Sequence, residues 1–193
     1  LNENDILFTR RFMIDHNIVP LTLYEAEGEF ATQKLKVPAF KAKKIEPSEG
    51  ETSLKPKILS IDIETYTPGY REIEPEKNPI IMIAFYAEDF QKVFAWKRFK
   101  TNLDYVEFVE SESELIEKFK ETIENYKPDI LTGYYTDGFD FPYIKTRADK
   151  YKIKLDLGLD FSELKIRKGI RTTAEITGIT HLDIFKFIRK IMA

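Results

Sequence analysis

Apolar and polar residues alternate along residues 58–65, which read Ile-Leu-Ser-Ile-Asp-Ile-Glu-Thr. A period of two over this length predicts a half-buried β-strand, with apolar side chains on one face and polar side chains on the other. Residues two positions apart share a face, at a rise of about 3.3 Å per residue. We therefore expect the carboxylates of Asp62 and Glu64 to point to the same side of this strand.

Two further strands are predicted directly after it. Residues 79–86, Pro-Ile-Ile-Met-Ile-Ala-Phe-Tyr, form a continuous apolar run, which is typical of a strand buried on both faces. Residues 93–96, Val-Phe-Ala-Trp, predict a short strand paired with it. Together the three strands predict an antiparallel meander.

A helix is predicted between Ser111 and Pro128. Ser111 and Glu114 have the spacing of a capping box, and apolar residues then recur at helical spacing. Residues 130–133 follow as a short strand. A helix that returns the chain to a strand makes a crossover unit, so the sequence predicts a mixed sheet.

Two more helices and a hairpin region are expected toward the end of the chain. Phe139, Asp140 and Pro142 open one helix, because proline and an acid are both favoured in a first turn. Another helix begins near Asp183, which we interpret as an N-cap rather than a ligand. Between these helices, residues 164–182 are expected to form one or two hairpins.

The N-terminal part of the chain has weaker signals. Residues 5–19 predict a helix, and residues 21–37 predict weak strands. Residues 41–56 are polar and contain proline and glycine, which predicts a linker. We therefore expect an N-terminal segment with a linker over residues 1–50 and one larger domain over residues 51–193.

The composition of the 193 residues narrows the function classes. The chain is 42% hydrophobic with a net charge of −3, so it can bury a sizeable core but lacks a strongly basic overall footprint for nucleic acid. The absence of cysteine excludes disulfides and thiolate zinc sites, and two histidines are too few for a histidine-based metal site. No apolar stretch has the length of a membrane span and no signal peptide is visible, so we expect a cytoplasmic protein with no membrane partner.

Three acids are candidates for metal binding. Asp62 and Glu64 share one strand face, and Asp140 stands at a strand-to-helix junction, where ligand groups of α/β sheets usually project. Carboxylates suit hard cations such as Mg²⁺ or Mn²⁺, and three of them can hold two ions about 3.5–4 Å apart for phosphoryl transfer. Solvated acids at a strand end, and a helix cap in the case of Asp140, are the competing interpretations.

An ordered set of motifs resembles the family B DNA polymerases. Residues 62–65, Asp-Ile-Glu-Thr, resemble the first exonuclease motif of that family. Residues 134–143, Tyr-Tyr-Thr-Asp-Gly-Phe-Asp-Phe-Pro-Tyr, resemble the second motif at a similar spacing. The surrounding segments, including residues 8–15, 79–83 and 181–184, are similar to archaeal members, so the resemblance covers nearly the whole chain.

The resemblance implies a fold and an activity. The fold is a ribonuclease-H-like α/β domain with a mixed central sheet flanked by helices, plus a small N-terminal appendage. The activity is 3′–5′ proofreading exonuclease within a DNA-directed DNA polymerase, with two Mg²⁺ or Mn²⁺ ions. By the same resemblance Asp62 bridges both ions, Glu64 binds the ion that activates water, and Asp140 serves the other ion, often through water.

The resemblance also implies partners and contacts with DNA. The expected partners are the 3′ end of a single strand or primer-template, the remainder of the polymerase chain, and, as a candidate, a sliding clamp. Tyr134 and Phe139 neighbour the site and could stack on bases, with core packing as the alternative. Cations of the expected hairpin could approach the strand, with a solvated edge strand as the alternative: Lys165, Arg167, Lys168 and Arg171.

Two departures from the family pattern keep other functions open. Tyr135 stands where the family usually has an asparagine, and a phenol cannot make the same amide hydrogen bonds. The chain also ends before the family's third exonuclease motif, so we expect a fragment with little activity by itself. The alternatives are a degraded nuclease fold that binds DNA or a protein without cutting and, ranked last, a related nuclease that acts on RNA.

Overall fold

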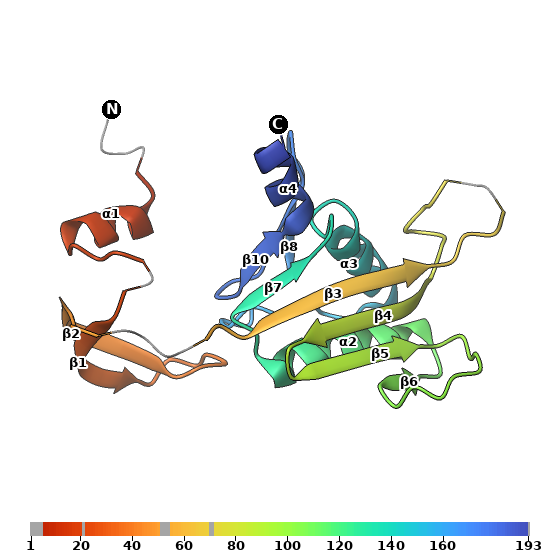
Figure 1. Cartoon of the computed structure of the whole chain (residues 1–193), viewed down its shortest axis with the longest axis horizontal. Helices are drawn as coiled ribbons and strands as arrows, with labels where there is room; N and C mark the ends of the chain where they lie inside the picture. Colours follow the sequence, from red (N-terminus) through yellow and green to blue (C-terminus); the bar gives the residue numbers. More distant parts are fainter. Residues whose placement is uncertain (1–5, 21, 51–54, 70–71, 193) are drawn as a thin grey trace. The chain divides into compact units, whose positions relative to one another are not determined.

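The computed structural model describes the chain except for residues 1–5, 21, 51–54, 70–71 and 193. The described residues fall into two compact units, Leu1–Lys55 and Pro56–Ala193 (Figure 1). Among the described residues, no helix is long and apolar enough to cross a membrane.

The first unit contains helix α1 (Phe8–Asp15) and an antiparallel pair of strands, β1 (Tyr24–Ala31) and β2 (Ala39–Pro47). The predicted helix and strand are therefore present, although residues 5 and 21 lie outside the described residues. The predicted linker over residues 41–56 is wrong in its first part, because residues up to Pro47 belong to β2.

Charge pairing explains how such a polar segment forms a strand. Glu27 of β1 lies opposite Lys44 of β2, and Glu29 lies opposite Lys41. Opposite charges in facing positions stabilise an antiparallel pair, whereas the lysines viewed alone indicate a solvated linker. The remainder of the predicted linker includes residues 51–54, which lie outside the described residues.

The second unit is built on a mixed sheet, in which six strands of the described residues pair in the order β10-β7-β3-β4-β5-β6. The strands are β3 (Ile58–Thr65), β4 (Ile80–Ala87), β5 (Phe90–Ala95), β6 (Val106–Phe108), β7 (Ile130–Gly133) and β10 (Thr180–Asp183). The β3-β4-β5 meander is antiparallel, whereas β3 and β10 both pair with β7 in parallel. The predicted meander and mixed sheet are confirmed.

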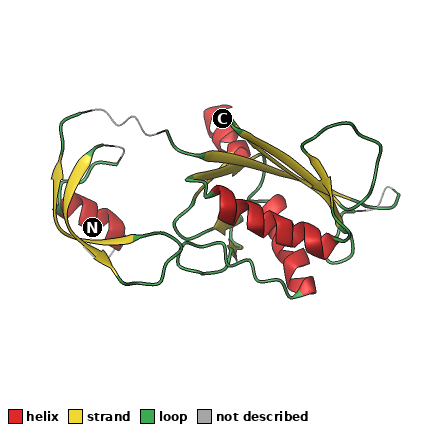
Figure 2. Ribbon diagram, turned by 90° about the horizontal axis from the view of Figure 1, so that it is seen from below, coloured by secondary structure: helices red, strands yellow, loops and turns green. Residues whose placement is uncertain are grey.

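Helices α2 (Glu112–Tyr126) and α3 (Asp140–Tyr151) lie on one face of the sheet (Figure 2). They pack on apolar side chains of β3 that point inward, such as Leu59 and Ile61, whereas Asp62 and Glu64 face outward. The prediction that β4 is buried on both faces is wrong. Its side chains alternate toward the end, and Tyr86 is 62% exposed, because the described helices cover a single face.

The start of α2, the hairpin near the end of the chain and the last helix lie where the sequence predicts them. The Ser111 hydroxyl accepts a hydrogen bond from the Glu114 amide at 3.2 Å, which confirms the predicted N-cap. The Glu114 carboxylate accepts from the Glu110 amide at 2.8 Å, one residue before the position that a capping box expects. The predicted hairpin and last helix are confirmed as β8 (Lys165–Arg167), β9 (Thr173–Glu175) and α4 (Ile184–Met192).

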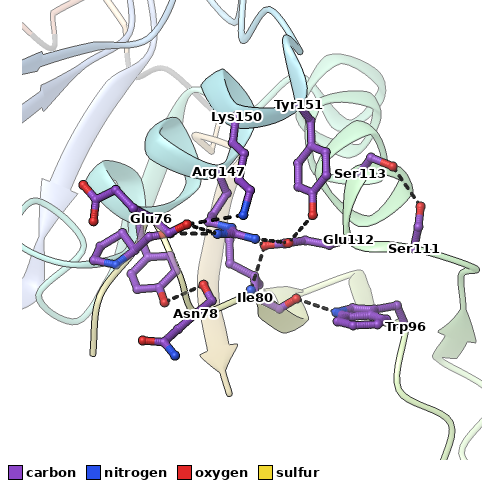
Figure 3. A network of polar contacts seen from close by, with 12 residues as sticks. Glu76, Asn78, Ile80, Trp96, Ser111, Glu112, Ser113, Arg147, Lys150 and Tyr151 are labelled. Atoms are coloured by element: carbon purple, nitrogen blue, oxygen red, sulfur yellow. Dashed lines mark hydrogen bonds and ion pairs between the residues drawn. The ribbon is translucent and has the colours of Figure 1, made fainter. Parts of the chain in front are cut away.

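A buried ion pair joins the two helices to the start of β4 (Figure 3). The Arg147 guanidinium donates to both carboxylate oxygens of Glu112, at 2.7 and 2.5 Å, and both side chains are almost fully buried. The same carboxylate accepts from the Ile80 amide and from the Tyr151 hydroxyl, each at 2.8 Å. A bidentate pair whose remaining lone pairs are used is the favourable form of a buried salt bridge.

Candidate metal and nucleic-acid site

The candidate site lies at an edge of β3 that loses its strand partner. Strand β7 pairs with β3 through Ile58, Leu59 and Ser60, and then turns away after Gly133. A Cβ atom on Gly133 would lie 2.6 Å from the Ile61 carbonyl oxygen, so this close approach of the two backbones requires glycine. The next turn of chain therefore brings the start of α3 to the exposed edge of β3.

Asp140 provides a hydrogen-bond acceptor for the backbone at that exposed edge of β3. Its Oδ1 atom accepts a hydrogen bond from the Ile63 amide at 3.2 Å, and the residue is only 2% exposed. Burial, followed by the negative charge of Asp62, raises the pKa of Asp140 to about 7. The structure thus brings Asp140 to the segment that carries Asp62, although Ile63 and Asp140 are 77 residues apart in the sequence.

The pKa of Asp62 is also raised, but its causes differ from those at Asp140. Burial is the largest cause that raises the pKa of Asp62, and the Ile63 amide partly opposes it. The charge of Asp140 is not among the causes that shift the pKa of Asp62. Among the described residues, no ion pair with lysine or arginine compensates either carboxylate. Two carboxylates that repel each other in a half-buried site form a natural cation site.

The third predicted ligand is less closely engaged. Glu64 lies on the same exposed face of β3 as Asp62. Within the described part of the chain, no three histidine, aspartate or glutamate side chains are gathered closely enough to form a ready-made metal site. The trio of Asp62, Glu64 and Asp140 therefore stays a prediction, of which the structure brings Asp62 and Asp140 together.

Asp183 holds the loop that delivers Asp140. Its carboxylate accepts from the amides of Tyr135 and Asp137, at 2.9 and 3.1 Å. It also accepts from the Phe185 amide at 2.9 Å, so it caps α4 as predicted. One side chain thereby fixes both the start of α4 and the loop before α3.

Asp137 is a buried anchor that sequence reasoning missed. Its carboxylate accepts from the Lys186 ammonium and the Ala174 amide, each at 2.5 Å, and lies 3.3 Å from His181 Nδ1. Burial lowers the pKa of His181, although Asp137 opposes this effect, so the imidazole is favoured in its neutral form. The partners of Asp137 are distant in sequence, so no local pattern signals this cluster.

The predicted aromatic contacts separate into exposed and packed residues. Tyr134 and Tyr135 are 61% and 46% exposed, and both rings lie edge-on to Phe185, at 5.4 and 5.0 Å between centroids. Phe139 packs against Tyr143 at 5.2 Å and is partly buried. Tyr134 and Tyr135 are thus available to a ligand, whereas Phe139 belongs to the edge of the core.

The four cations predicted on the hairpin also differ in their surroundings. Lys165 and Arg167 lie on β8, where Arg167 pairs with Glu175 at 2.8 Å on the surface. Lys168 follows in the hairpin turn, and Arg171 lines a cavity of about 540 Å³. Two further cations of this cavity, Arg189 and Lys190 of α4, were not predicted. Their spacing from Lys186, three and four residues along one helix face, is the signal that could have found them.

Comparisons with known proteins agree with the sequence motifs. A family model described as DNA polymerase family B, exonuclease domain, matches residues 2–193. A DNA polymerase of Methanocaldococcus jannaschii is 34% identical over 191 residues, covering 98% of this chain and 10% of the relative. A DNA polymerase of Pyrococcus glycovorans is 38% identical over 190 residues, covering 97% of this chain and 20% of the relative.

A solved structure shows the same fold. The family B DNA polymerase from the hyperthermophilic archaeon Pyrobaculum calidifontis aligns with a TM-score of 0.76 at 22% identity. The alignment covers 97% of this chain and 23% of that one. The chain thus spans a quarter or less of the length of these proteins.

Proposed function

The chain belongs to the exonuclease-domain family of the family B DNA polymerases, and we propose that it supplies part of a site that hydrolyses the 3′-terminal nucleotide of a DNA strand. The predicted ribonuclease-H-like α/β fold, with its mixed sheet and flanking helices, is confirmed by the structural relative. The observation that carries the proposal is the buried Asp140 carboxyl beside Asp62, without a compensating cation among the described residues.

The chemistry of these groups fits a divalent cation. Asp62 and Asp140 present oxygen donors whose raised pKa values record unfavourable burial and, at Asp140, repulsion. Such groups gain most from a bound Mg²⁺ or Mn²⁺, and Glu64, on the same face as Asp62, is the further ligand. When bound, a pair of such ions lowers the pKa of an attacking water and stabilises the leaving oxygen of an in-line displacement.

The protein's own groups set the conditions for that chemistry. Asp140 releases its proton near pH 7, so the free site becomes fully anionic only at neutral or higher pH. The hydrogen bond from the Ile63 amide holds one Asp140 oxygen at the strand edge. Because the described residues include no assembled group of three ligands, this chain by itself should bind cations weakly and release few nucleotides.

A non-cutting DNA-binding module is the second candidate. Tyr135, at the position where the family usually has asparagine, favours it, because the ring faces a cavity rich in cations. In either case the partners would be a single-stranded 3′ end, the rest of a polymerase chain and, more remotely, a sliding clamp. Both candidates share the DNA substrate and differ in hydrolysis.

The test uses a polymerase chain that contains these residues and a single strand labelled at its 3′ end. Release of labelled mononucleotide with Mg²⁺ should fall in the Asp140→Asn variant by more than the roughly 10–100-fold that is typical for loss of an outer-shell partner. Glu121→Gln, at an exposed position of α2, is the charge-matched control and should release at the unchanged rate. Release that survives Asp140→Asn would contradict the nuclease proposal.

A further inference from the structure

Strand β4 contains a β-bulge opposite the end of β3 that carries Glu64. Glu64 pairs with Met82 in the antiparallel ladder. The next residue, Thr65, pairs with Ile80, so Ile81 is an extra residue in β4. A bulge bends its strand and increases the local twist, and bulges are frequent next to active sites, where they change the direction of a side chain.

The burial of β4 follows from this bulge. Ile80 and Ile83 are both 0% exposed, although residues three positions apart point to opposite faces of a regular strand. The extra residue returns Ile80 to the inner face, where it joins the core. The sheet therefore keeps its core up to this end, while its outer face carries Asp62 and Glu64.

Two side chains pair with the backbone of Ile80, beside the bulge (Figure 3). The Glu112 carboxylate accepts from the Ile80 amide at 2.8 Å, and the Trp96 indole donates to the Ile80 carbonyl at 2.5 Å. The Trp96 amide also donates to the carbonyl of Ile81, the extra residue, at 3.3 Å. Because buried backbone groups need partners, these contacts stabilise the bulge.

Tyr143 of α3 connects the end of β3 to the loop before β4. Its hydroxyl donates to the Asn78 carbonyl at 2.9 Å, and the residue is 1% exposed. Burial raises the pKa of Tyr143, whereas the charge of Arg147 and a hydrogen bond with the Thr65 side chain lower it. The phenol thus joins Thr65, at the end of one strand, to Asn78, two residues before the other.

The Glu64 carboxylate depends on this backbone for its direction. Its neighbours Ile63 and Thr65 are both held by side chains of α3. The carboxylate itself makes no hydrogen bond or ion pair with another described residue. The rotamers open to a side chain depend on the backbone that carries it, so the bulge decides which region Glu64 can reach.

We propose that Trp96 and Tyr143 are positioning residues of the candidate metal site, which fix the bulge and thereby direct the Glu64 carboxylate to the side of Asp62. The inference rests on the proposed nuclease function and adds two residues to it. Both residues act through the backbone of β3 and β4 rather than by contact with the cation or the DNA. Loss of a supporting residue of this kind typically weakens metal binding by roughly 10–100-fold.

The first test is the Mn²⁺ affinity of the purified chain, measured by electron paramagnetic resonance of the free ion. Tyr143→Phe and Trp96→Phe each remove one donor and keep a ring, and each should weaken binding about tenfold. Tyr126→Phe removes a hydroxyl that donates to Asp89 at 3.0 Å, and this matched control should bind normally. If one variant does not fold, the other decides, and wild-type affinity in a folded positioning variant would overturn the proposal.

A double-mutant cycle distinguishes positioning from a general loss of structure. If Tyr143 acts through Glu64, Glu64→Gln should itself weaken Mn²⁺ binding, and adding Tyr143→Phe should then cost less than about twofold. A merely structural role would give the full loss in both backgrounds. Such additivity would contradict the proposal.

Hydrogen exchange in EDTA examines the bulge without any cation. The Ile80 amide in Trp96→Phe and the Tyr66 amide in Tyr143→Phe should exchange about fivefold faster than in the wild type, the factor that corresponds to one hydrogen bond. Amides of α2 should exchange at the wild-type rate. Unchanged exchange at the bulge, or faster exchange throughout the core, would count against a local positioning role.

Nucleotide release by a polymerase chain that contains these residues separates this proposal from the nuclease proposal. Tyr143→Phe should lower kcat about tenfold and leave KM for DNA within about twofold, whereas a rise in KM alone would contradict positioning. If Asp140→Asn preserves release while the Mn²⁺ cycle shows coupling, the nuclease proposal fails and the positioning role stands. If release requires Asp140 but Tyr143→Phe adds its full loss to Glu64→Gln, the positioning role alone fails.

Discussion

Helix α3 carries two buried charged side chains in opposite surroundings. Asp140, at its first residue, and Arg147, about two turns later, are each 2% exposed. Arg147 meets the carboxylate of Glu112 and donates a hydrogen bond to each of its two oxygens. Asp140 meets Asp62, which carries the same charge, and its pKa rises as a result.

The difference separates a structural cluster from a functional one. In the Arg147 cluster, the guanidinium also donates to the carbonyls of Pro75 and Glu76, at 2.9 and 3.0 Å, so the loop before β4 is fixed. In the Asp140 cluster, the charge is left for something outside the described residues to neutralise. Satisfied buried charges organise a fold, whereas uncompensated ones indicate a ligand site.

The largest expected effect tests the satisfied cluster. Arg147→Met should lower the free energy of unfolding by about 3–5 kcal/mol, because it leaves the Glu112 carboxylate buried without its partner. Urea unfolding measures the change. Arg98→Met, which breaks an exposed pair with Glu110, should cost no more than about 1 kcal/mol. Equal losses in both variants would remove the distinction between a buried and an exposed pair.

The next largest expected effect is a gain in the free energy of unfolding rather than a loss. Asp140→Asn keeps an oxygen acceptor for the Ile63 amide and removes the repelling charge, so it should stabilise the metal-free protein at pH 8. A shift from 3.8 to about 7 sets a ceiling of about 4 kcal/mol on this gain, at about 1.4 kcal/mol per pKa unit. Urea unfolding of both proteins at pH 8 and pH 5 measures it.

The pH dependence of that gain follows from the raised pKa. Below pH 3.8 the Asp140 carboxyl is protonated in the folded and unfolded states, so its full contribution to stability is present. That contribution is lost as the pH rises through about 7, because the folded state must then give up a proton that it binds more tightly. The advantage of Asp140→Asn should therefore shrink between pH 8 and pH 5, and an advantage independent of pH would contradict the account.

A smaller effect concerns added cation. Mg²⁺ at ten times its dissociation constant should stabilise the wild-type protein by about 1.4 kcal/mol at pH 8, as measured by thermal unfolding. The Asp140→Asn variant should show little of this gain, because it lacks one of the two converging carboxylates. Asp104→Asn, an exposed acid elsewhere, serves as the control. A gain that is equal in all three proteins would indicate non-specific binding.

The smallest effect tests what positions Glu112. Ser111→Ala removes the hydroxyl that accepts from the Glu114 amide and should cost about 1 kcal/mol in urea unfolding. Ser113→Ala removes a hydroxyl that contacts Ser111 and should cost less, since Ser113 is not the cap. A loss as large as that of Arg147→Met would mean that the cap, rather than the ion pair, holds this end of α2.

The sequence predicted correctly those elements whose signals lie within a few neighbouring residues. The alternation along β3 and the cap at Ser111 are read within a few residues, and both are present in the structure. The strand β2 was missed because its lysines are favourable only opposite the glutamates of β1, which the lysine segment alone does not show. Burial on both faces was wrongly predicted for β4, because an apolar run does not show which faces will be covered.

The candidate site was predictable only in part for the same reason. The motifs identify Asp62 and Asp140, and the structure adds that burial and proximity raise the pKa of the second. Glu112 and Arg147 are 35 residues apart, and Asp137 and Lys186 are 49 apart, so no periodicity relates them. Arg189 and Lys190 are recognised as cavity residues only when the fold places the hairpin tip and Tyr135 beside α4.

The most direct test is a ¹³C NMR titration of the Asp140 carboxyl in the purified chain, with and without Mg²⁺. Without the cation, the carboxyl should titrate near pH 7, and with Mg²⁺ its midpoint should fall, because a bound cation favours the ionised form. A midpoint near 4 that is the same in both conditions would contradict the claim that Asp140 and Asp62 form an uncompensated pair awaiting a cation.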